Sequence, residues 1–455
     1  MAIPFPKRFG ATMLALAAGA AALAASTPAS ALNLQEAYQL ALQNDPVYRS
    51  AFYENEGGKE SRIIGRSYLL PSLVGNLNTS KNVTDIESES TNLLGKPVTS
   101  LTHPKYTSRI ATVQLRQPLF NLEALARYNT GKAQSEMSEQ VFSARGQELL
   151  MRVIGAYIDA LFADDQVALA ESQRDAFKEQ QMVSERLLKD GEGTRTDLLE
   201  VQGRYQLSEA QLIESRDAQA NARDTLEGII GTPVETLAGL NSTFRMRPLE
   251  INNLEEWRAT ALKDNPELQA QLTALEVARQ QIKQSSAGHY PKLDFVASYS
   301  QNKAETINTF NQDATIRAIG IQLVVPLYQG GAISASTRQA VAALEKARAD
   351  LQTKTDKVMV EVNKQFKAVQ SGVARVAALD RAVDAGNLLI TATQQSIKGG
   401  VRINLDLLNA RQQLFLSKRD LAQARYGYML AILRLRAAAG TLDANDVNQT
   451  ASFFR

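Results

Sequence analysis

The two halves of this chain of 455 residues repeat one another, and this duplication constrains the fold more than any other feature of the sequence. Pro46 recurs as Pro266 and Pro71 recurs as Pro291, in each case 220 positions later and among further identical residues. Chance supplies scattered leucine matches, but it does not supply paired prolines and glycines in the same order, so we expect a duplicated fold. The expected divisions are a first repeat at 32–240, a second repeat at 241–441 and a C-terminal tail at 442–455.

The first residues have the pattern of a secretory signal peptide. Lys7 and Arg8 precede a run, residues 11–25, that is almost entirely Ala, Leu, Met and Gly. Ala29-Ser30-Ala31 then offers the small residues of a cleavage site. A membrane anchor is the alternative, but the apolar run is too short to cross a bilayer. We therefore expect residues 1–31 to be removed on export.

Composition excludes several classes of function. Cleavage removes Lys7 and Arg8 but no acidic residue, so the mature chain has 50 − 2 = 48 basic and 48 acidic side chains. A nucleic-acid partner therefore has no electrostatic support. The chain has no cysteine, which rules out disulfides, thiolate catalysis and lipid attachment through an N-terminal cysteine. No later run of about eighteen uncharged apolar residues occurs, so we expect no transmembrane helix.

Each repeat has the pattern of a helix, a hairpin, a very long helix, a tight turn and another long helix. The expected hairpins lie at 72–117 and 292–325, the very long helices at 122–188 and 332–398, and the helices after the turns at 195–230 and 403–439. A very long helix without proline spans on the order of 100 Å. Large side chains at a seven-residue spacing follow the last helix, at Leu407, Leu414, Leu421, Tyr428 and Leu435. This spacing predicts lateral packing, as in a coiled coil.

The hairpins alternate apolar and polar residues over roughly ten positions, which is the length that a tilted strand needs to cross a bilayer. In the first strand, Leu73 and Leu77 alternate with Asn76 and Asn78. An ordinary half-buried hairpin would show the same alternation. However, the chain has only four such strands and no other sheet for them to pack on, and unpaired strand edges cannot lie in lipid. The strands can therefore cross a membrane only if several chains close one barrel together.

Three segments carry a resemblance to a known family. They are Gln322-Leu323-Val324-Val325-Pro326-Leu327-Tyr328-Gln329-Gly330-Gly331, Gly288-His289-Tyr290-Pro291-Lys292-Leu293, and Gly191-Glu192-Gly193-Thr194-Arg195-Thr196-Asp197-Leu198-Leu199. In their order within a duplicated frame, they resemble the TolC family of outer-membrane channel proteins. The last segment is similar to the branch that serves type I secretion systems. The resemblance covers nearly the whole mature chain.

This resemblance implies a mainly α fold with membrane β-strands. Three chains would each give four strands to one twelve-stranded barrel in the outer membrane, in contact with its lipid. Below it, a coiled helical barrel would cross the periplasm as a water-filled conduit. Its far end would meet a periplasmic adaptor protein attached to an inner-membrane transporter, which is either an ABC transporter or proton-driven. The implied function is export of proteins, small molecules or both, without a cofactor.

The resemblance also assigns residues to the closed aperture at the periplasmic end. By position, Asp406 matches an aperture carboxylate, and Asn409 replaces a second one. Arg402 matches a constricting arginine, with Thr196 and Asp197 as its partners.

One family residue of this closing network is missing here, because Ile397 stands where the family has a tyrosine. The tip turns would contact the adaptor, and they comprise Gly191, Glu192, Gly193, Thr194, Arg195, Gly399, Gly400 and Val401.

Helix capping is an alternative role for the tip residues. Thr194 and Asp197 have the spacing of a capping box, and Asp406 lies in a first helical turn, where exposed N–H groups and the helix dipole favour a carboxylate. Capping alone would explain their presence.

Other classes of protein fit less well. His103 and His289 lie near no candidate nucleophile or cluster of metal ligands, so we expect neither an enzyme nor a metal site. A periplasmic coiled-coil adaptor is the main alternative, but it would need an anchor and many short strands around one helical hairpin. A secreted structural coiled coil would leave the two amphipathic hairpins unexplained.

Overall fold

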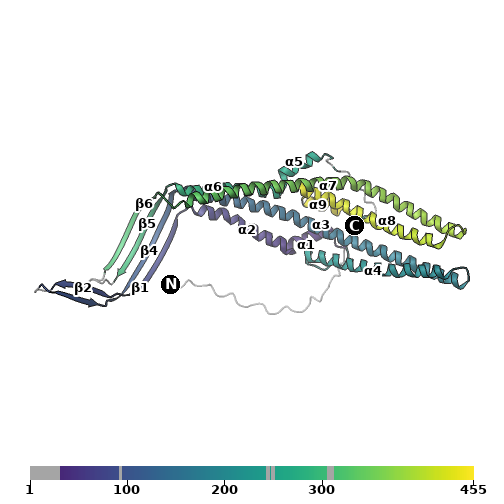
Figure 1. Cartoon of the computed structure of the whole chain (residues 1–455), viewed down its shortest axis with the longest axis horizontal. Helices are drawn as coiled ribbons and strands as arrows, with labels where there is room; N and C mark the ends of the chain where they lie inside the picture. The colour runs from purple at the N-terminus through teal and green to yellow at the C-terminus, as the bar shows by residue number, and fades with distance from the viewer. Residues whose placement is uncertain are drawn as a thin grey trace, which may run out of the picture.

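The computed structural model places a small sheet at one end of a long helical body (Figure 1). The structure describes residues 31–91, 95–241, 246, 249, 252–304 and 312–454. The predicted signal peptide lies outside the described residues except for Ala31, as does most of 242–251, which is part of the linker between α4 and α5. No helix in the described part of the chain has the length and apolar character that a membrane span requires.

The two repeats have the same order of helices and main-sheet strands, although the first adds two strands and the second adds a 3₁₀ turn. The first contains α1 (Leu34–Asn44), α2 (Pro46–Ser67), β1 (Ser72–Val83), β2 (Ile86–Thr91), β3 (Pro97–Thr102), β4 (Lys105–Phe120), α3 (Leu122–Lys189) and α4 (Arg195–Ile230). The second contains α5 (Leu254–Asp264), α6 (Pro266–Ser286), a 3₁₀ turn (Ala287–His289), β5 (Lys292–Ala304), β6 (Gln312–Val324), α7 (Ala332–Lys398) and α8 (Asn404–Ala439), and α9 (Ala444–Ala451) follows. The mainly α fold with few strands, expected from the sequence, is confirmed.

Matching side chains begin and end the helices in the two repeats. Asp45 caps α2 and Asn265 caps α6, each followed by the proline that starts its helix. At the other ends, α4 and α8 stop at Gly231 and Gly440, whose φ angles are +73° and +78°. A Cβ atom at Gly440 would lie 2.4 Å from the Asp264 carbonyl oxygen, so glycine is required where α8 meets the α5–α6 corner.

Four antiparallel strands form one open sheet in the order β1-β4-β5-β6. The two repeats meet where β4 pairs with β5, and one row across the sheet reads Leu73, Leu115, Ala297 and Ile319. This face is apolar and lies open, since Ile319 is 80 % exposed. Among the described residues, no strand pairs with the outer edge of β1 or of β6.

The first hairpin differs from the simple one expected at 72–117. β2 and β3 pair with each other in a separate two-stranded sheet beyond the ends of β1 and β4 (Figure 1). Where this extension begins, the Thr84 amide donates to the Pro104 carbonyl and His103 Nδ1 lies 2.5 Å from Asp85 Oδ1. The four expected amphipathic strands are all present in the main sheet, but this additional hairpin was not predicted, because β2 is almost entirely Glu, Ser and Thr and has no apolar alternation.

The main core lies midway along the helical body, where α1, α3, α4, α8 and α9 meet. Tyr157 is fully buried there, and its hydroxyl lies 2.9 Å from the Leu32 carbonyl oxygen and 3.1 Å from that of Ala238. Phe454 of the C-terminal tail packs edge-on against the Tyr157 ring. Leu32 near the start of the described chain, Ala238 of the linker between the repeats and Phe454 of the tail therefore meet at the same level of the helical body. The large residues of the predicted α8 seam, Leu407, Leu414, Leu421, Tyr428 and Leu435, are all buried.

Candidate functional site

The two tip turns lie at the end of the helical body opposite the sheet (Figure 1). Gly191 and Gly400 adopt positive φ angles, +78° and +72°, which let each chain reverse direction directly after its long helix. In the second turn the Val401 amide donates to the Ser396 carbonyl at 3.0 Å, and the first turn makes the equivalent bond at 2.9 Å. Gly193 and Gly399 complete the turns. The duplication thus places equivalent turns at the same end of the molecule.

Thr194 and Asp197 are engaged with each other at the start of α4. The Asp197 amide donates to Thr194 Oγ1 at 3.1 Å, and the Thr194 hydroxyl donates to Asp197 Oδ2 at 2.7 Å. Thr194 therefore caps α4 as the alternative to a gate role predicted, but Asp197 bonds to the Thr194 hydroxyl and not to the backbone N–H that a capping box uses. Arg195 and Thr196 are exposed beside this cap, and so is Glu192 in the turn.

Asp406 has a different environment, although it lies at the equivalent level in the first turn of α8. The residue before this helix is Ile403, whose side chain cannot cap it. Within the described residues, no hydrogen bond or ion pair engages the Asp406 carboxylate, which is partly exposed. The helix dipole favours its charge, but no local bond uses its oxygens.

Arg402 is exposed at the second tip turn. Across the described ranges, neither a hydrogen bond nor an ion pair joins Arg402 to Thr196 or Asp197. The predicted bond between the two tip turns is therefore not made inside one chain. It stays a prediction for neighbouring chains in an assembly.

Asn409 does have a partner, which the sequence did not indicate. Its Oδ1 accepts a hydrogen bond from Arg204 Nη2 at 3.0 Å, which joins α8 to α4. Burial lowers the pKa of the Arg411 guanidinium, whose Nη1 donates to the backbone carbonyl of Ala176 on α3 at 2.6 Å. Sequence reasoning missed Arg204 and Arg411 because polar residues on long helices look alike before the helices are packed.

A cleft of about 460 Å³ separates the two helical pairs at the tip. It is lined by Leu187, Thr194 and Asp197 from the first pair and by Ile397 and Leu407 from the second. Ile397 is the residue that replaces the family tyrosine. An isoleucine cannot donate a hydrogen bond to Asp197 across this space, so the cleft has no polar bridge from this position.

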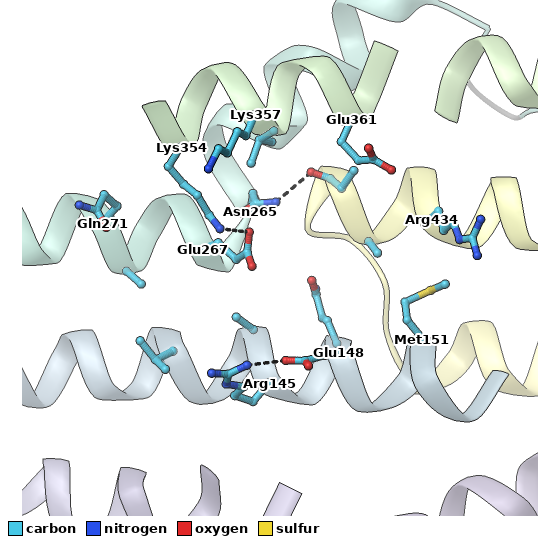
Figure 2. A pocket seen from close by; sticks show the side chains of 17 residues that line it. Arg145, Glu148, Met151, Asn265, Glu267, Gln271, Lys354, Lys357, Glu361 and Arg434 are labelled. Carbon is cyan, nitrogen blue, oxygen red and sulfur yellow. Dashed lines mark hydrogen bonds and ion pairs between the residues drawn. The ribbon is translucent and has the colours of Figure 1, made fainter. Parts of the chain in front are cut away.

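A larger cavity of about 680 Å³ lies midway along the body, between α3, α6, α7 and α8 (Figure 2). Its charges are mixed and mostly paired: Arg145 with Glu148 at 2.6 Å, and Lys354 with Glu267 at 2.7 Å. No single sign of charge dominates its walls, so it favours no class of charged ligand. In the described part of the chain, no group of three or more His, Cys, Asp or Glu side chains could hold a metal ion.

Charged pairs lie at the other end, where the sheet meets the helices, and they join strand to strand and strand to helix. Arg116 Nε donates to Asp294 Oδ2 at 2.9 Å, and Asp294 is fully buried. At the start of α3, Glu123 accepts hydrogen bonds from Lys292 at 2.6 Å and from Arg127 at 2.7 Å. Burial acts to raise the pKa of Glu123, but the bonds from Lys292 and Arg127 outweigh it, and the pKa lies below its ordinary value. The bond from Lys292 on β5 to Glu123 on α3 therefore joins the sheet directly to the helical body.

Comparison with known proteins gives the family. The family model described as "Outer membrane efflux protein" matches residues 37–232 and 257–441, which is most of the chain and both repeats. The alkaline protease secretion protein AprF of Pseudomonas aeruginosa is 41% identical over 438 residues, covering 96% of this chain and 90% of AprF. The proteases secretion protein PrtF of Dickeya chrysanthemi is 36% identical, covering 94% of this chain and 92% of PrtF.

Solved structures agree on the fold. The Campylobacter jejuni CmeC outer membrane channel superposes with a TM-score of 0.77 at 16% identity, covering 93% of this chain and 90% of CmeC. At that identity the match concerns the fold alone. Sequence and fold comparisons thus agree on outer-membrane transport proteins. The chain therefore belongs to the outer membrane efflux protein family, the TolC family predicted from its sequence, and is an outer-membrane transport protein.

Proposed function

We propose that this chain is the outer-membrane channel of a type I secretion system and that its cargo is a secreted protease. AprF and PrtF, whose names state that they serve protease secretion, match nearly the whole chain at 41% and 36% identity. The chain would work with a periplasmic adaptor and an inner-membrane ABC transporter. Small molecules, as in drug efflux, are the second class of cargo, favoured only by the general family description.

The observation that carries this proposal is the open four-stranded sheet. Its β1 and β6 edges are unpaired in the described chain, and its apolar face is exposed, with Leu77 and Ile319 both at 80 %. In lipid, every backbone hydrogen bond must be satisfied, and only a closed barrel does this for strands. Three copies would pair β1 of one chain with β6 of the next and close twelve strands.

Exposed aromatic residues support the placement of this sheet in the membrane. Tyr68, Phe120, Tyr290 and Tyr328 flank the ends of the strands where the sheet meets the helices, and Tyr328 is 87 % exposed. Aromatic girdles mark the membrane interfaces of outer-membrane barrels. These four residues would lie at the periplasmic interface, with the helical body entirely in water.

The helical body then forms the conduit. At 1.5 Å per residue, α3 and α7 each span about 100 Å, which carries the path from the membrane deep into the periplasm. At the far end, Val401 is 82 % exposed and Ile403 is 62 % exposed. Apolar side chains this exposed suit a protein partner, and we assign the two tip turns to the adaptor.

The aperture residues keep the roles implied by the family. In a trimer, three Asp406 carboxylates would converge at the narrow end and favour cations. Arg402 would bond to Thr196 and Asp197 of the neighbouring chain, because its own chain offers no such bond.

Complementation tests the function directly. A Pseudomonas aeruginosa strain that lacks AprF would be given this chain, AprF itself or an empty vector, and alkaline protease activity would be measured in the medium. We expect this chain to restore secretion well above the empty vector. If the chain reaches the outer membrane as a trimer while the protease stays inside the cells, the proposed role in protease secretion is wrong.

A further inference from the structure

A cavity of about 240 Å³ lies in the groove between α3 and α6, where the helical body meets the sheet. We call it the interfacial pocket. Its lining comes from the first two turns of α3, the end of α6 and the turn before β5, and comprises Leu122, Leu125, Ala126, Asn129, Gln280, Lys283, Ser286, Ala287 and Tyr290. The interfacial pocket therefore offers apolar contact and hydrogen bonds in the same small space.

The interfacial pocket lies on the side of the helices that continues the apolar face of the sheet. Glu123 bonds to Lys292 at 2.6 Å, and Lys292 alternates with the apolar Leu293, so Glu123 marks the polar side. Leu125 lies about 200° further round α3, on the opposite side, and is 46 % exposed. At the foot of the apolar face, Phe120 pairs with Leu293, only two residues before the first residue that lines the pocket.

The interfacial pocket is also at the level of lipid headgroups if the sheet spans the membrane. From Leu122 to Asn129, α3 rises about 10 Å. The polar layer on each side of the hydrocarbon core is about 5 to 8 Å thick. Tyr290, which lines the pocket and is 51 % exposed, is one of the aromatic residues assigned above to the periplasmic interface. A headgroup of the periplasmic leaflet would therefore lie beside the pocket.

Two polar side chains of the interfacial pocket are not engaged by the protein. Across the described part of the chain, neither a hydrogen bond nor an ion pair holds the Lys283 ammonium or the Asn129 amide. Lys283 is exposed, and Asn129 is partly buried in the groove. An ammonium and an amide N–H group together suit a phosphodiester, whose oxygens only accept hydrogen bonds.

Gln280 adds an acceptor that has no donor. Its side chain is 7 % exposed, its Nε2 donates to Glu276 Oε1 at 2.6 Å, and its Oε1 is buried without a partner among the described residues. The bond from Gln280 lowers the pKa of Glu276, so this carboxylate is ionised at neutral pH and requires the amide nitrogen to face it. The Gln280 oxygen therefore lacks a donor, and a molecule bound in the interfacial pocket could supply one.

We propose that the interfacial pocket binds the headgroup of an ethanolamine phospholipid from the periplasmic leaflet. Lys283 and Asn129 donate to its phosphodiester, and its ammonium donates to Gln280. The acyl chains lie over Phe120 and Leu293 on the apolar face of the sheet. One chain forms the whole pocket, but the position of the pocket in the membrane rests on the function proposed above.

The duplication limits this site to one of two equivalent grooves. At the offset of 220 positions, Lys283 corresponds to Ile63 and Gln280 corresponds to Glu60. The groove that α7 and α2 of neighbouring chains would form therefore lacks both the lysine and the amide. We expect three lipid sites in a trimer rather than six.

Native mass spectrometry on the delipidated full-length protein in detergent tests this proposal. The protein would be titrated with dioleoyl phosphatidylethanolamine and, separately, with dioleoyl phosphatidylcholine, whose quaternary ammonium cannot donate a hydrogen bond. We expect three ethanolamine lipids to bind each trimer, severalfold more tightly than the choline lipid.

Two variants separate the parts of the site. Lys283→Gln should weaken the binding of both lipids about tenfold, because the phosphodiester loses a charge-assisted hydrogen bond. Gln280→Leu should remove only the preference for the ethanolamine lipid. The matched control is Arg62→Gln, which removes an exposed arginine at the corresponding level of α2, outside the pocket, and should bind both lipids as wild type does.

Inorganic phosphate distinguishes a lipid site from a site for free phosphate. Excess ammonium phosphate, added before the measurement, should leave the bound lipid in place because it offers no acyl chains. If phosphate displaces the lipid from wild type, the interfacial pocket is a phosphate site and the lipid proposal is wrong.

The outcomes also separate this proposal from the proposed function. If the extracted protein is not a trimer, the closed barrel fails, but lipid can still be titrated on the single chain. If wild type, Lys283→Gln and Arg62→Gln bind both lipids equally, the lipid lies only in the detergent belt and the interfacial pocket is not a site. If Lys283→Gln does not assemble, the comparison of the two lipids on Gln280→Leu decides.

Discussion

Replacing Tyr157 by phenylalanine should weaken the contact between Leu32, near the start of the described chain, and Ala238 in the linker between the repeats. We call this contact the joint. Burial raises the pKa of the Tyr157 hydroxyl, so this group keeps its proton and donates at any physiological pH. It lies 2.9 Å from Leu32 O and 3.1 Å from Ala238 O. Leu32 O also accepts from the Ala238 amide at 3.1 Å and keeps that bond, whereas Ala238 O has no other partner among the described residues.

The size of the destabilisation follows from the hydrogen bonds that each carbonyl keeps without the Tyr157 hydroxyl. Tyr157→Phe leaves one buried carbonyl without a donor, which costs about 1 to 3 kcal/mol. Each 1.4 kcal/mol shifts an equilibrium about tenfold. If the joint opens locally, the Ala238 amide, whose bond to Leu32 closes the joint, should exchange its hydrogen at least several times faster than in wild type.

Hydrogen exchange read by mass spectrometry on the detergent-extracted protein measures this effect. Tyr53→Phe is the matched control, because Tyr53 is 68 % exposed and lies on α2. Peptides that contain Ala238 should exchange faster only in Tyr157→Phe. If their exchange is unchanged, or if every peptide speeds up equally, the hydroxyl does not hold this joint.

Three further predictions concern the two ends of the molecule. Asp406→Ala should reduce cation selectivity and also reduce the block by multivalent cations in planar bilayers. If the selectivity is unchanged, Asp406 serves only to interact with the helix dipole at the start of α8. If Arg402 bonds to Asp197 of a neighbouring chain, Arg402→Ser should raise single-channel conductance without loss of the trimer. A conductance equal to that of wild type would show that Arg402 does not hold the aperture closed. Glu123→Gln should lower thermal stability at pH 7. Because the folded-state pKa of Glu123 is depressed, its stabilisation is present above the ordinary glutamate pKa, about 4.3, and is lost as pH falls through the folded value. Thermal melts of wild type and variant should therefore converge in acid, and an equal gap at pH 3 and pH 7 would contradict the assignment.

Much of the fold could be predicted because its boundaries depend on local backbone chemistry. Proline after a capping Asp45 or Asn265 starts a helix wherever it occurs, and glycine with positive φ, as at Gly231 and Gly440, ends one. The seven-residue seam predicted lateral packing of α8, and its large residues are buried. The polar hairpin of β2 and β3 was not predicted, because its sequence shows no regular alternation of apolar and polar residues.

The site could be predicted only in outline. Family position singled out Asp406 and Arg402, but the capping alternative treated Asp197 and Asp406 alike, although Thr194 precedes one and Ile403 precedes the other. The structure makes this distinction, since Asp197 bonds to Thr194 whereas Asp406 has no partner in the described chain. The hydrogen bond from Arg204 to Asn409 was missed for a different reason. Its two residues lie 205 positions apart, and their pairing follows from the packing of α4 against α8 alone.

The central claim is that several copies of this chain close one membrane channel through the edges of an open sheet. The mass of the detergent-extracted protein, measured by light scattering with the detergent subtracted, tests it most directly. We predict the mass of three chains, from protein that fractionates with the outer membrane. A stable monomer whose β1 and β6 edges remain open, or protein found in the inner membrane, would contradict the account.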